Sequence, residues 1–270
     1  MISGLPRSGS TLLCQILNMN PAFNATQTSP IMEMLAAHQS VFSHSPSFKA
    51  VDRLDYYQNF AAAQKAFIDS YYKGDKVIFD KNRAWPGFFM KLDKILANED
   101  AKVIWTYRKI EHCISSMENQ HRKYPLIQFP DEQGGANMNS LEGRINAWTG
   151  DGGILTRPIY QLHDAVEMGY GDRILIIDYD DLCIDTQATM NKIHKFLGYK
   201  KFNYDSKSFV DLKQSTHEHD NLYNYKYPHD IKEGKIVHSV PKSVVPDRLK
   251  DAIAEKYQWL TKYIKETNKE

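Results

Sequence analysis

Residues 4–11, Gly-Leu-Pro-Arg-Ser-Gly-Ser-Thr, join a short apolar stretch to a helical pattern and limit the possible folds more than any other segment. They have the GxxxxG frame of a phosphate-binding loop. Glycines let a backbone wrap around an anion, and the helix start behind the loop offers unpaired N–H groups and a positive dipole end. Ser10 replaces the usual lysine, which leaves Arg7 as the cation within the loop. The segment predicts an anion-binding turn, with a plain helix-capping turn as the alternative.

Short apolar runs rich in β-branched and aromatic residues predict parallel strands that are buried on both faces. These runs cover residues 1–4, 76–80, 103–107 and 174–179. Helical patterns cover residues 10–18, 56–72, 110–117, 141–168, 187–197 and 248–264, and the pattern over 141–168 breaks near Gly150–Gly153. Strands that alternate with helices indicate βαβ units. We therefore expect a single α/β domain over residues 1–270, P-loop-like, with a mostly parallel sheet flanked by helices.

The composition excludes several classes of protein. Among 270 residues, 34 Lys and Arg balance 33 Asp and Glu, which argues against general nucleic-acid binding. No apolar run approaches the ~18 residues of a membrane span, and we expect a cytoplasmic protein. Cys14, Cys113 and Cys183 lie far apart without metal-ligand spacing, so we expect reduced core cysteines and no metal site.

The loop resembles the phosphosulfate loop of the sulfotransferase family. Its sequence is similar to the P-R-S-G-[ST]-T motif, in the form found in tyrosylprotein sulfotransferases and small bacterial relatives. The family uses 3′-phosphoadenylyl sulfate (PAPS) and releases adenosine 3′,5′-bisphosphate. The resemblance implies that the 5′-phosphosulfate is held by Pro6, Arg7, Ser8, Gly9, Ser10 and Thr11.

The resemblance also implies a second cradle, for the 3′-phosphate of PAPS. Arg108 follows the third apolar run, and Ser116 comes eight positions later, as in the family. An arginine at a strand end offers a two-pronged fork to a phosphate, although a strand-capping Arg with a solvent-facing Ser is the alternative. Gln120 stands where tyrosylprotein sulfotransferases have another arginine. Tyr179 matches the family's strand end near the adenine, with an ordinary core tyrosine as the alternative.

Lys81 matches the catalytic lysine of the family, which stabilises the leaving phosphate. It directly follows a buried run, at the carboxyl end of a predicted parallel strand, where ligands of α/β proteins bind. A surface lysine at the start of a loop is the alternative. The same run ends in Asp80 and fits a Walker B motif, so a P-loop kinase that uses ATP and Mg²⁺ remains a rival. Lys235, His238 and Lys242 form a basic segment that can close over a nucleotide or stay in solvent.

The base for the acceptor hydroxyl does not follow from the family pattern. Tyrosylprotein sulfotransferases use a Glu downstream of the loop arginine, but residues 25–29 hold no carboxylate here. We expect Glu33 to face the cleft from a charge-poor helix, where burial raises the pKa of a carboxyl group. The equal alternative is an acidic residue in the first turn of a helix, where the helix dipole stabilises its negative charge. Further candidates for the base are His217, His219 and His229.

Together these features predict an in-line, metal-independent sulfuryl transfer from PAPS to a hydroxyl. The acceptor is a small molecule, a glycan or a peptide. Besides the kinase, a non-catalytic nucleotide-binding protein remains an alternative, because Thr28 and Gln120 stand in segments where the family has charged residues.

Overall fold

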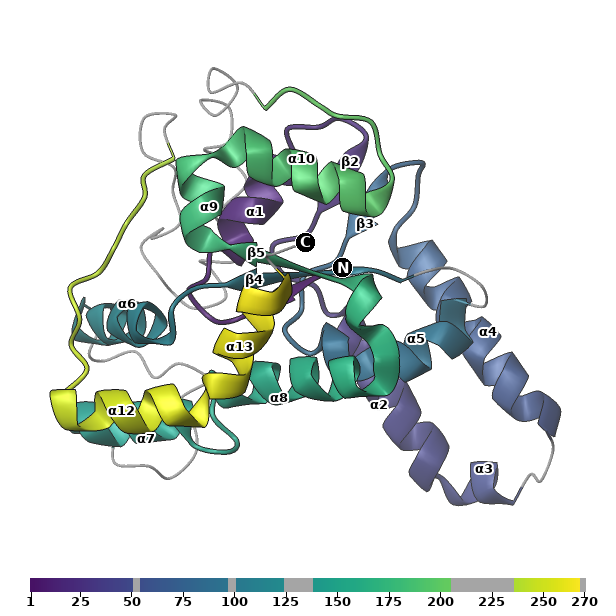
Figure 1. Cartoon of the computed structure of the whole chain (residues 1–270). Helices are drawn as coiled ribbons and strands as arrows, with labels where there is room; N and C mark the ends of the chain where they lie inside the picture. The colour runs from purple at the N-terminus through teal and green to yellow at the C-terminus, as the bar shows by residue number, and fades with distance from the viewer. Residues whose placement is uncertain (51–53, 97–100, 124–137, 205–235, 268–270) are drawn as a thin grey trace.

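Short parallel strands form the centre of the computed structural model, which describes residues 1–50, 54–96, 101–123, 138–204 and 236–267 (Figure 1). One sheet has the order β1-β4-β5, where β1 is Ile2–Gly4, β4 is Val103–Tyr107 and β5 is Ile174–Asp178. A second sheet pairs β2 (Phe23–Ala25) with β3 (Val77–Phe79), and all pairs are parallel.

A single parallel bridge joins the two sheets. Ile2 of β1 faces Lys81 just after β3, and the N–H of Ile2 donates to the carbonyl of Asp80 at 2.7 Å. The strands therefore follow one another across the molecule in the order β2-β3-β1-β4-β5. After β1 the chain forms β2 and β3 on one side of β1 and then crosses to form β4 and β5 on the other side. Open α/β sheets bind ligands at the carboxyl ends of the strands beside such a change of side.

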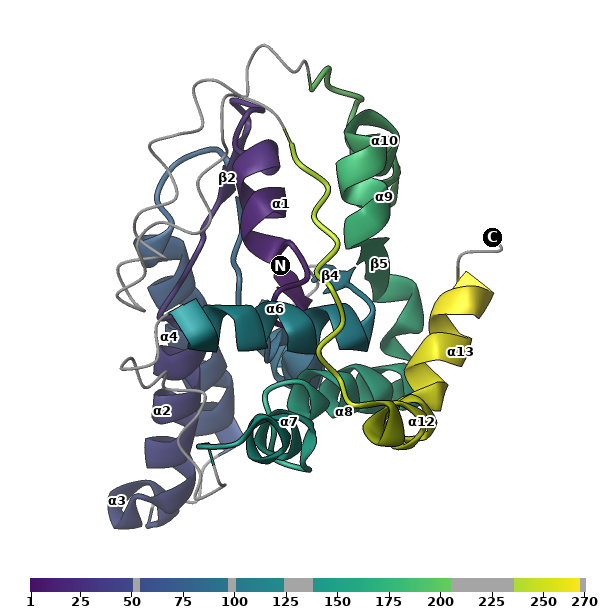
Figure 2. The ribbon, with the colours of Figure 1, turned by 90° about the vertical axis from the view of Figure 1, so that its left-hand side faces the viewer.

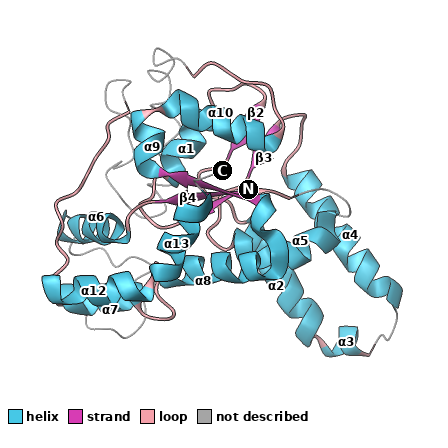
Figure 3. Cartoon of the chain, in the orientation of Figure 1, coloured by secondary structure: helices cyan, strands magenta, loops and turns pink. Residues whose placement is uncertain are grey.

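Helices cover both faces of these strands (Figure 3). The bounds of the N-terminal helices are α1 Ser10–Leu17, α2 Ile31–His44, α3 Pro46–Lys49, α4 Leu54–Tyr71, η1 Trp85–Phe88 and α5 Phe89–Leu96. The bounds of the middle helices are α6 Ile110–Lys123, α7 Leu141–Thr149, α8 Thr156–Ala165, η3 Val166–Tyr170 and η4 Gly171–Arg173. The bounds of the remaining helices are α9 Tyr179–Ile184, α10 Thr186–Leu197, α12 Asp247–Lys256 and α13 Gln258–Thr267.

Two hydrophobic cores lie on opposite faces of the sheet. Ile104 of β4 and Ile177 of β5 belong to the core that contains α1, α9 and α10. Trp105 and Ile176, their neighbours in sequence, belong to the core that contains α5, α7 and α8. Because successive side chains of a strand point to opposite faces, strands buried on both sides read as unbroken apolar runs.

The predicted α/β architecture with its mostly parallel sheet is confirmed, while several element bounds were wrong. The sequence analysis missed β2, which has three residues, one of them the exposed Asn24. The break expected near Gly150–Gly153 is confirmed, because α7 ends at Thr149 and α8 begins at Thr156, whereas the interruption of the helix over 248–264 at Tyr257 was not predicted. The fourth strand ends at Asp178, whose side chain accepts a bond from the N–H of Asp180 and so starts α9.

The cysteines are free, as the sequence predicted. Cys14 and Cys113 are buried, and burial raises the pKa of their thiols to about 11 and about 12. Cys183 is only half-buried, so its expected place in the core was wrong. No helix in the described part of the chain is long and apolar enough to cross a membrane.

Replacing Gly4 by alanine is expected to lower the free energy of unfolding by more than the cost of its positive φ alone. Gly4 has a φ of 134°, and a Cβ there would lie 2.3 Å from the carbonyl oxygen of Thr106. A backbone conformation of this kind costs a residue with a side chain roughly 1–3 kcal/mol. Gly74→Ala is the matched control, because Gly74 has a φ of 111° but open space around it. Urea unfolding should show the larger loss for Gly4→Ala, and equal losses would contradict the predicted clash.

Candidate active site

The loop between β1 and α1 presents uncapped backbone N–H groups. Gly9 has a left-handed φ of 85°, and no side chain caps the helix that starts at Ser10. Arg7 also has a positive φ, of 61°, which is uncommon for a residue with a side chain. Backbone turns of this kind gather N–H groups into an anion-binding concavity, and the dipole of α1 adds to the attraction.

Thr106 of β4 fixes the shape of this loop. Its carbonyl accepts the N–H of Leu5 at 3.0 Å, and its hydroxyl donates to the carbonyl of Ser3 at 3.1 Å. The Ser8 hydroxyl lies 2.6 Å from the Thr106 hydroxyl and donates to the Leu5 carbonyl, also at 2.6 Å. Ser8 is therefore buried and engaged with protein atoms, so its backbone N–H rather than its hydroxyl is available to a ligand.

Lys81 reaches the loop from the neighbouring strand. Its ammonium donates to the hydroxyl of Thr11, in the first turn of α1, at 3.0 Å. Its backbone N–H donates to the hydroxyl of Thr26 at 3.2 Å, which ties the ends of β2 and β3 together. The sheet thus brings Lys81 and Thr11, two of the residues selected from the sequence, into direct contact.

Arg7 and Arg108 connect the loop to α6. The Nε of Arg7 donates to the hydroxyl of Ser116 at 3.1 Å, and Nη1 of Arg108 donates to the carbonyl of Arg7 at 3.1 Å. Arg108 is buried, and its Nε has no hydrogen-bond partner in the described part of the chain. The two predicted anion cradles are therefore adjacent, and Arg7 belongs to both.

Tyr179 stands between the loop and Arg108. The guanidinium of Arg108 lies 4.0 Å from the centre of its ring, which is cation–π geometry. A Cβ on Gly9 would lie 2.7 Å from the same ring, so glycine is what lets the ring approach the loop. Burial raises the pKa of the Tyr179 phenol.

Residues 236–245 cross α6 and α9 as an extended strap, drawn in yellow-green in Figure 2. The carbonyl of Ser239 accepts a bond from Nη2 of Arg108, and its N–H donates to the Tyr179 hydroxyl at 3.3 Å. Nε2 of His238 lies 2.8 Å from a carboxylate oxygen of Asp180. The strap thus covers the second cradle. Lys242 lies in it, whereas Lys235 is outside the described residues.

Asp80 does not have the environment of a magnesium ligand. It is buried, and its two carboxylate oxygens accept bonds from the Trp85 indole at 2.8 Å and from the Tyr72 hydroxyl. A Walker B aspartate has to turn an oxygen towards the metal. No group of three or more His, Cys, Asp or Glu residues lies together as a metal site in the ranges the structure describes.

Comparison with known proteins identifies the family. A model described as the sulfotransferase family matches residues 1–203. The chain belongs to the sulfotransferase family. No curated protein matches it.

Solved structures of sulfotransferases share the fold. A sulfotransferase domain from the curacin biosynthetic pathway is 14% identical with a TM-score of 0.62, and the match covers 96% of each chain. Sulfotransferase STF9 from Mycobacterium avium is also 14% identical, with a TM-score of 0.50, and the match covers 97% of this chain and 75% of that one.

The structure describes one of the candidate bases of this sulfotransferase, Glu33. Glu33 lies in the first turn of α2, as expected, but it is exposed, so its predicted burial was wrong. Its carboxylate accepts a bond from the side chain of Asn82, the residue after Lys81, at 3.3 Å. Gln27 lies in the segment where the family has its Glu; it is buried, and its side-chain oxygen has no hydrogen-bond partner in the described part of the chain. The histidines 217, 219 and 229 lie outside the described residues.

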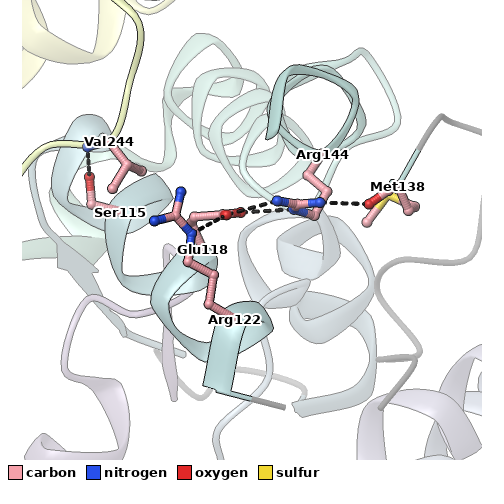
Figure 4. A network of polar contacts seen from close by, with 6 residues as sticks. All are labelled: Ser115, Glu118, Arg122, Met138, Arg144 and Val244. Atoms are coloured by element: carbon pink, nitrogen blue, oxygen red, sulfur yellow. Dashed lines mark hydrogen bonds and ion pairs between the residues drawn. The ribbon is translucent and has the colours of Figure 1, made fainter. Parts of the chain in front are cut away.

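A buried ion-pair network holds α6, the helix that carries Ser116, against α7 (Figure 4). Glu118 is fully buried and accepts two bonds from Arg144 of α7, at 2.7 and 2.8 Å, and one from Arg122 at 2.7 Å. Arg144 also donates to the carbonyl of Met138 at 2.7 Å. One turn earlier on α6, the Ser115 hydroxyl accepts the N–H of Val244 from the strap at 3.2 Å.

Removing Arg144 is expected to cost far more stability than removing Arg122. The Arg144 side chain is 9% exposed and that of Arg122 58%. Without Arg144 the buried carboxylate of Glu118 loses its buried partner, and breaking such a pair lowers the free energy of unfolding by roughly 3–5 kcal/mol. An ion pair with an exposed partner such as Arg122 contributes about 0–1 kcal/mol. Chemical unfolding of Arg144→Ala and Arg122→Ala measures the difference, and equal losses would show that Glu118 does not depend on Arg144.

Proposed function

We propose that this sulfotransferase transfers the sulfuryl group of PAPS to an acceptor hydroxyl, without a metal, and releases adenosine 3′,5′-bisphosphate. The observation that carries the proposal is the pair of contacts from Arg7 to Ser116 and from Arg108 to Arg7. They support two anion-binding groups that lie side by side at the carboxyl edge of the sheet. A donor with a phosphosulfate and a separate 3′-phosphate has the charges that such a pair attracts.

The residues divide into two binding groups. In the first, the loop residues Pro6, Arg7, Ser8, Gly9, Ser10 and Thr11 hold the 5′-phosphosulfate, chiefly through the backbone N–H groups of residues 7–11. Pro6 has no N–H and restricts the conformation of the loop. In the second, Arg108 and Ser116 hold the 3′-phosphate. The carbonyl of Ser239, which now accepts a bond from Arg108, gives way to a phosphate oxygen, because a charged acceptor makes the stronger bond. Tyr179 lines the nucleotide site beside Arg108.

Lys81 acts on the leaving group. In-line transfer of a sulfuryl group resembles phosphoryl transfer, in which positioning and charge stabilisation supply most of the rate. The ammonium of Lys81, next to Thr11, is placed to neutralise the charge that develops on the 5′-phosphate as its bond to sulfur breaks. Glu33, the candidate base from the sequence, is exposed to solvent and accepts a bond from the side chain of Asn82, the residue after this lysine.

The rival kinase function has less support. The loop has serine in place of the lysine that reaches the β- and γ-phosphates of a nucleoside triphosphate. Asp80, the residue that would hold Mg²⁺, is buried and bonded to Tyr72 and Trp85. Both observations favour a metal-free donor over ATP with Mg²⁺.

Adenosine 3′,5′-bisphosphate is expected to stabilise the protein against heat more than AMP, or ATP with Mg²⁺, at equal concentration. A ligand at ~100 times its Kd adds about 2.7 kcal/mol to the free energy of unfolding. Arg7→Ala and Arg108→Ala should each abolish most of the shift, because each removes a cation from the cradles. A larger shift with ATP and Mg²⁺ would overturn the assignment in favour of a kinase.

Lys81→Ala is expected to lower kcat far more than the affinity for the nucleotide. The lysine is proposed to act on charge that appears only as the bond to the leaving phosphate breaks, so its loss falls on the transition state. Steady-state kinetics with PAPS and calorimetry with the bisphosphate separate the two effects. Lys94→Ala, an exposed site on α5, is the control and should change neither. An equal fall in kcat and affinity would make Lys81 a binding residue only.

A further inference from the structure

Asp80 is a buried carboxylate one residue before the proposed catalytic lysine. It is 5% exposed, and two neutral donors hold it, the indole of Trp85 and the hydroxyl of Tyr72. Burying a carboxylate costs free energy that neutral hydrogen bonds repay only in part. A buried carboxylate that directly precedes this lysine, at the carboxyl edge of the sheet, is a candidate for a functional role.

A chain of hydroxyl groups leads to this carboxylate. Tyr72 donates its proton to Oδ2 of Asp80, which leaves the phenol oxygen free to accept bonds. The hydroxyl of Ser29 lies 3.1 Å from that oxygen and itself accepts the N–H of Ile31 at 3.1 Å. The proton of Ser29 therefore points at Tyr72, and the direction of the chain runs from Ser29 through Tyr72 to Asp80.

The chain lies at the same edge of the sheet as the phosphate loop. Ser29 follows β2, and Asp80 follows β3, two strands that are parallel and in register. The Thr26 hydroxyl accepts the N–H of Lys81 at 3.2 Å and donates to the carbonyl of Phe79 at 3.4 Å, which joins the ends of β2 and β3. Tyr72 is bonded to Asp80, and the ammonium of the next residue, Lys81, contacts Thr11 in the loop.

The protonation of Tyr72 allows it to pass a proton on but not to act as a base by itself. Burial, and then the negative charge of Asp80, raise the pKa of its phenol well above the usual range. Tyr72 therefore stays protonated at neutral pH. It can accept a proton only as it passes its own to Asp80, which makes the two residues one unit.

We propose that Tyr72 and Asp80 form a relay that removes the proton of the acceptor hydroxyl. The inference rests on the proposed sulfotransferase activity and names the group that completes it. The acceptor oxygen forms a bond to sulfur, and the bond between sulfur and the bridging phosphate oxygen breaks. The electron pair of that broken bond stays on the 5′-phosphate beside Lys81. The acceptor's proton moves to the Tyr72 oxygen while the proton of Tyr72 moves to Oδ2 of Asp80.

Glu33 is the competing carboxylate. It is exposed to water and bonded to Asn82, whereas Asp80 is enclosed and already hydrogen-bonded to a proton donor that other hydroxyls approach. In the relay, Tyr72 is the catalytic residue that touches the acceptor. Asp80 acts through Tyr72 and positions it.

The test compares Tyr72→Phe with Tyr71→Phe, a neighbouring tyrosine that is 48% exposed. Release of adenosine 3′,5′-bisphosphate from PAPS is measured with water, simple alcohols and phenols as acceptors. Because a positioned general base contributes roughly 10²–10⁴-fold, Tyr72→Phe should lower kcat by about 10²-fold or more. The KM for PAPS and the Kd for the bisphosphate should stay unchanged. Tyr71→Phe should behave as wild type.

Two further variants establish whether Tyr72 and Asp80 act together. Asp80→Asn should lose as much kcat as Tyr72→Phe, and the double variant should lose no more than either single one, because both belong to one proton path. Glu33→Gln should retain most of the activity. If Asp80→Asn fails to fold, Tyr72→Phe and Glu33→Gln still decide the question.

Several outcomes would overturn the relay. Full activity in Tyr72→Phe would do so while leaving the proposed sulfotransferase function intact. A large loss in Glu33→Gln alone would assign the proton to Glu33. A Tyr72→Phe variant that loses nucleotide affinity together with kcat would show a packing role. A wild-type chain that neither binds the bisphosphate nor consumes PAPS would instead refute the proposed function itself.

Discussion

The contact between Thr106 and the loop after β1 is the constraint on which the site depends. A loop that binds anions through N–H groups must hold them without the help of helix or sheet bonds of its own. Thr106 supplies that support through its backbone and its hydroxyl, which together engage Ser3, Leu5 and Ser8. Gly4 admits this contact because any side chain would overlap the Thr106 carbonyl.

The parallel sheet then gathers residues that are far apart in the sequence. The carboxyl ends of parallel strands lie at one edge, so whatever follows β1, β3, β4 and β5 meets there. Arg7, Lys81, Arg108 and Tyr179 each come directly or shortly after one of these strands. The bridge between Ile2 and Lys81 matters most, because it attaches the β2-β3 pair to the strand that carries the loop.

Arg7 was selected from the loop motif, and Lys81 and Arg108 from their places after apolar runs together with the family resemblance. The structure brings these three residues to one edge of the sheet, because parallel strands end there. Sequence reasoning missed β2, since three residues with an exposed Asn24 carry too little pattern. It also assigned a buried setting to Glu33, because low local charge does not reveal which face of a helix meets solvent.

Tyr72 could not be selected from the sequence for a different reason. It follows a helix with many aromatic residues, and nothing in the spacing separates it from its exposed neighbour Tyr71. Only the fold brings its hydroxyl to Asp80 and Ser29. The Asp80 that fitted a Walker B motif by sequence has instead the surroundings of a buried proton acceptor, because Trp85 and Tyr72 bond to its carboxylate oxygens.

The cations of the site are already arranged for an exchange of partners. Arg7 donates to the hydroxyl of Ser116, Lys81 to that of Thr11, and Arg108 to two backbone carbonyls. These acceptors are neutral, and an incoming phosphate or sulfate oxygen can take their place. The cation then exchanges a bond to a neutral oxygen for one to an anionic oxygen, which adds the attraction between two opposite charges. The same bonds hold the cations in position before the ligand arrives, and this reduces the ordering that binding would otherwise require.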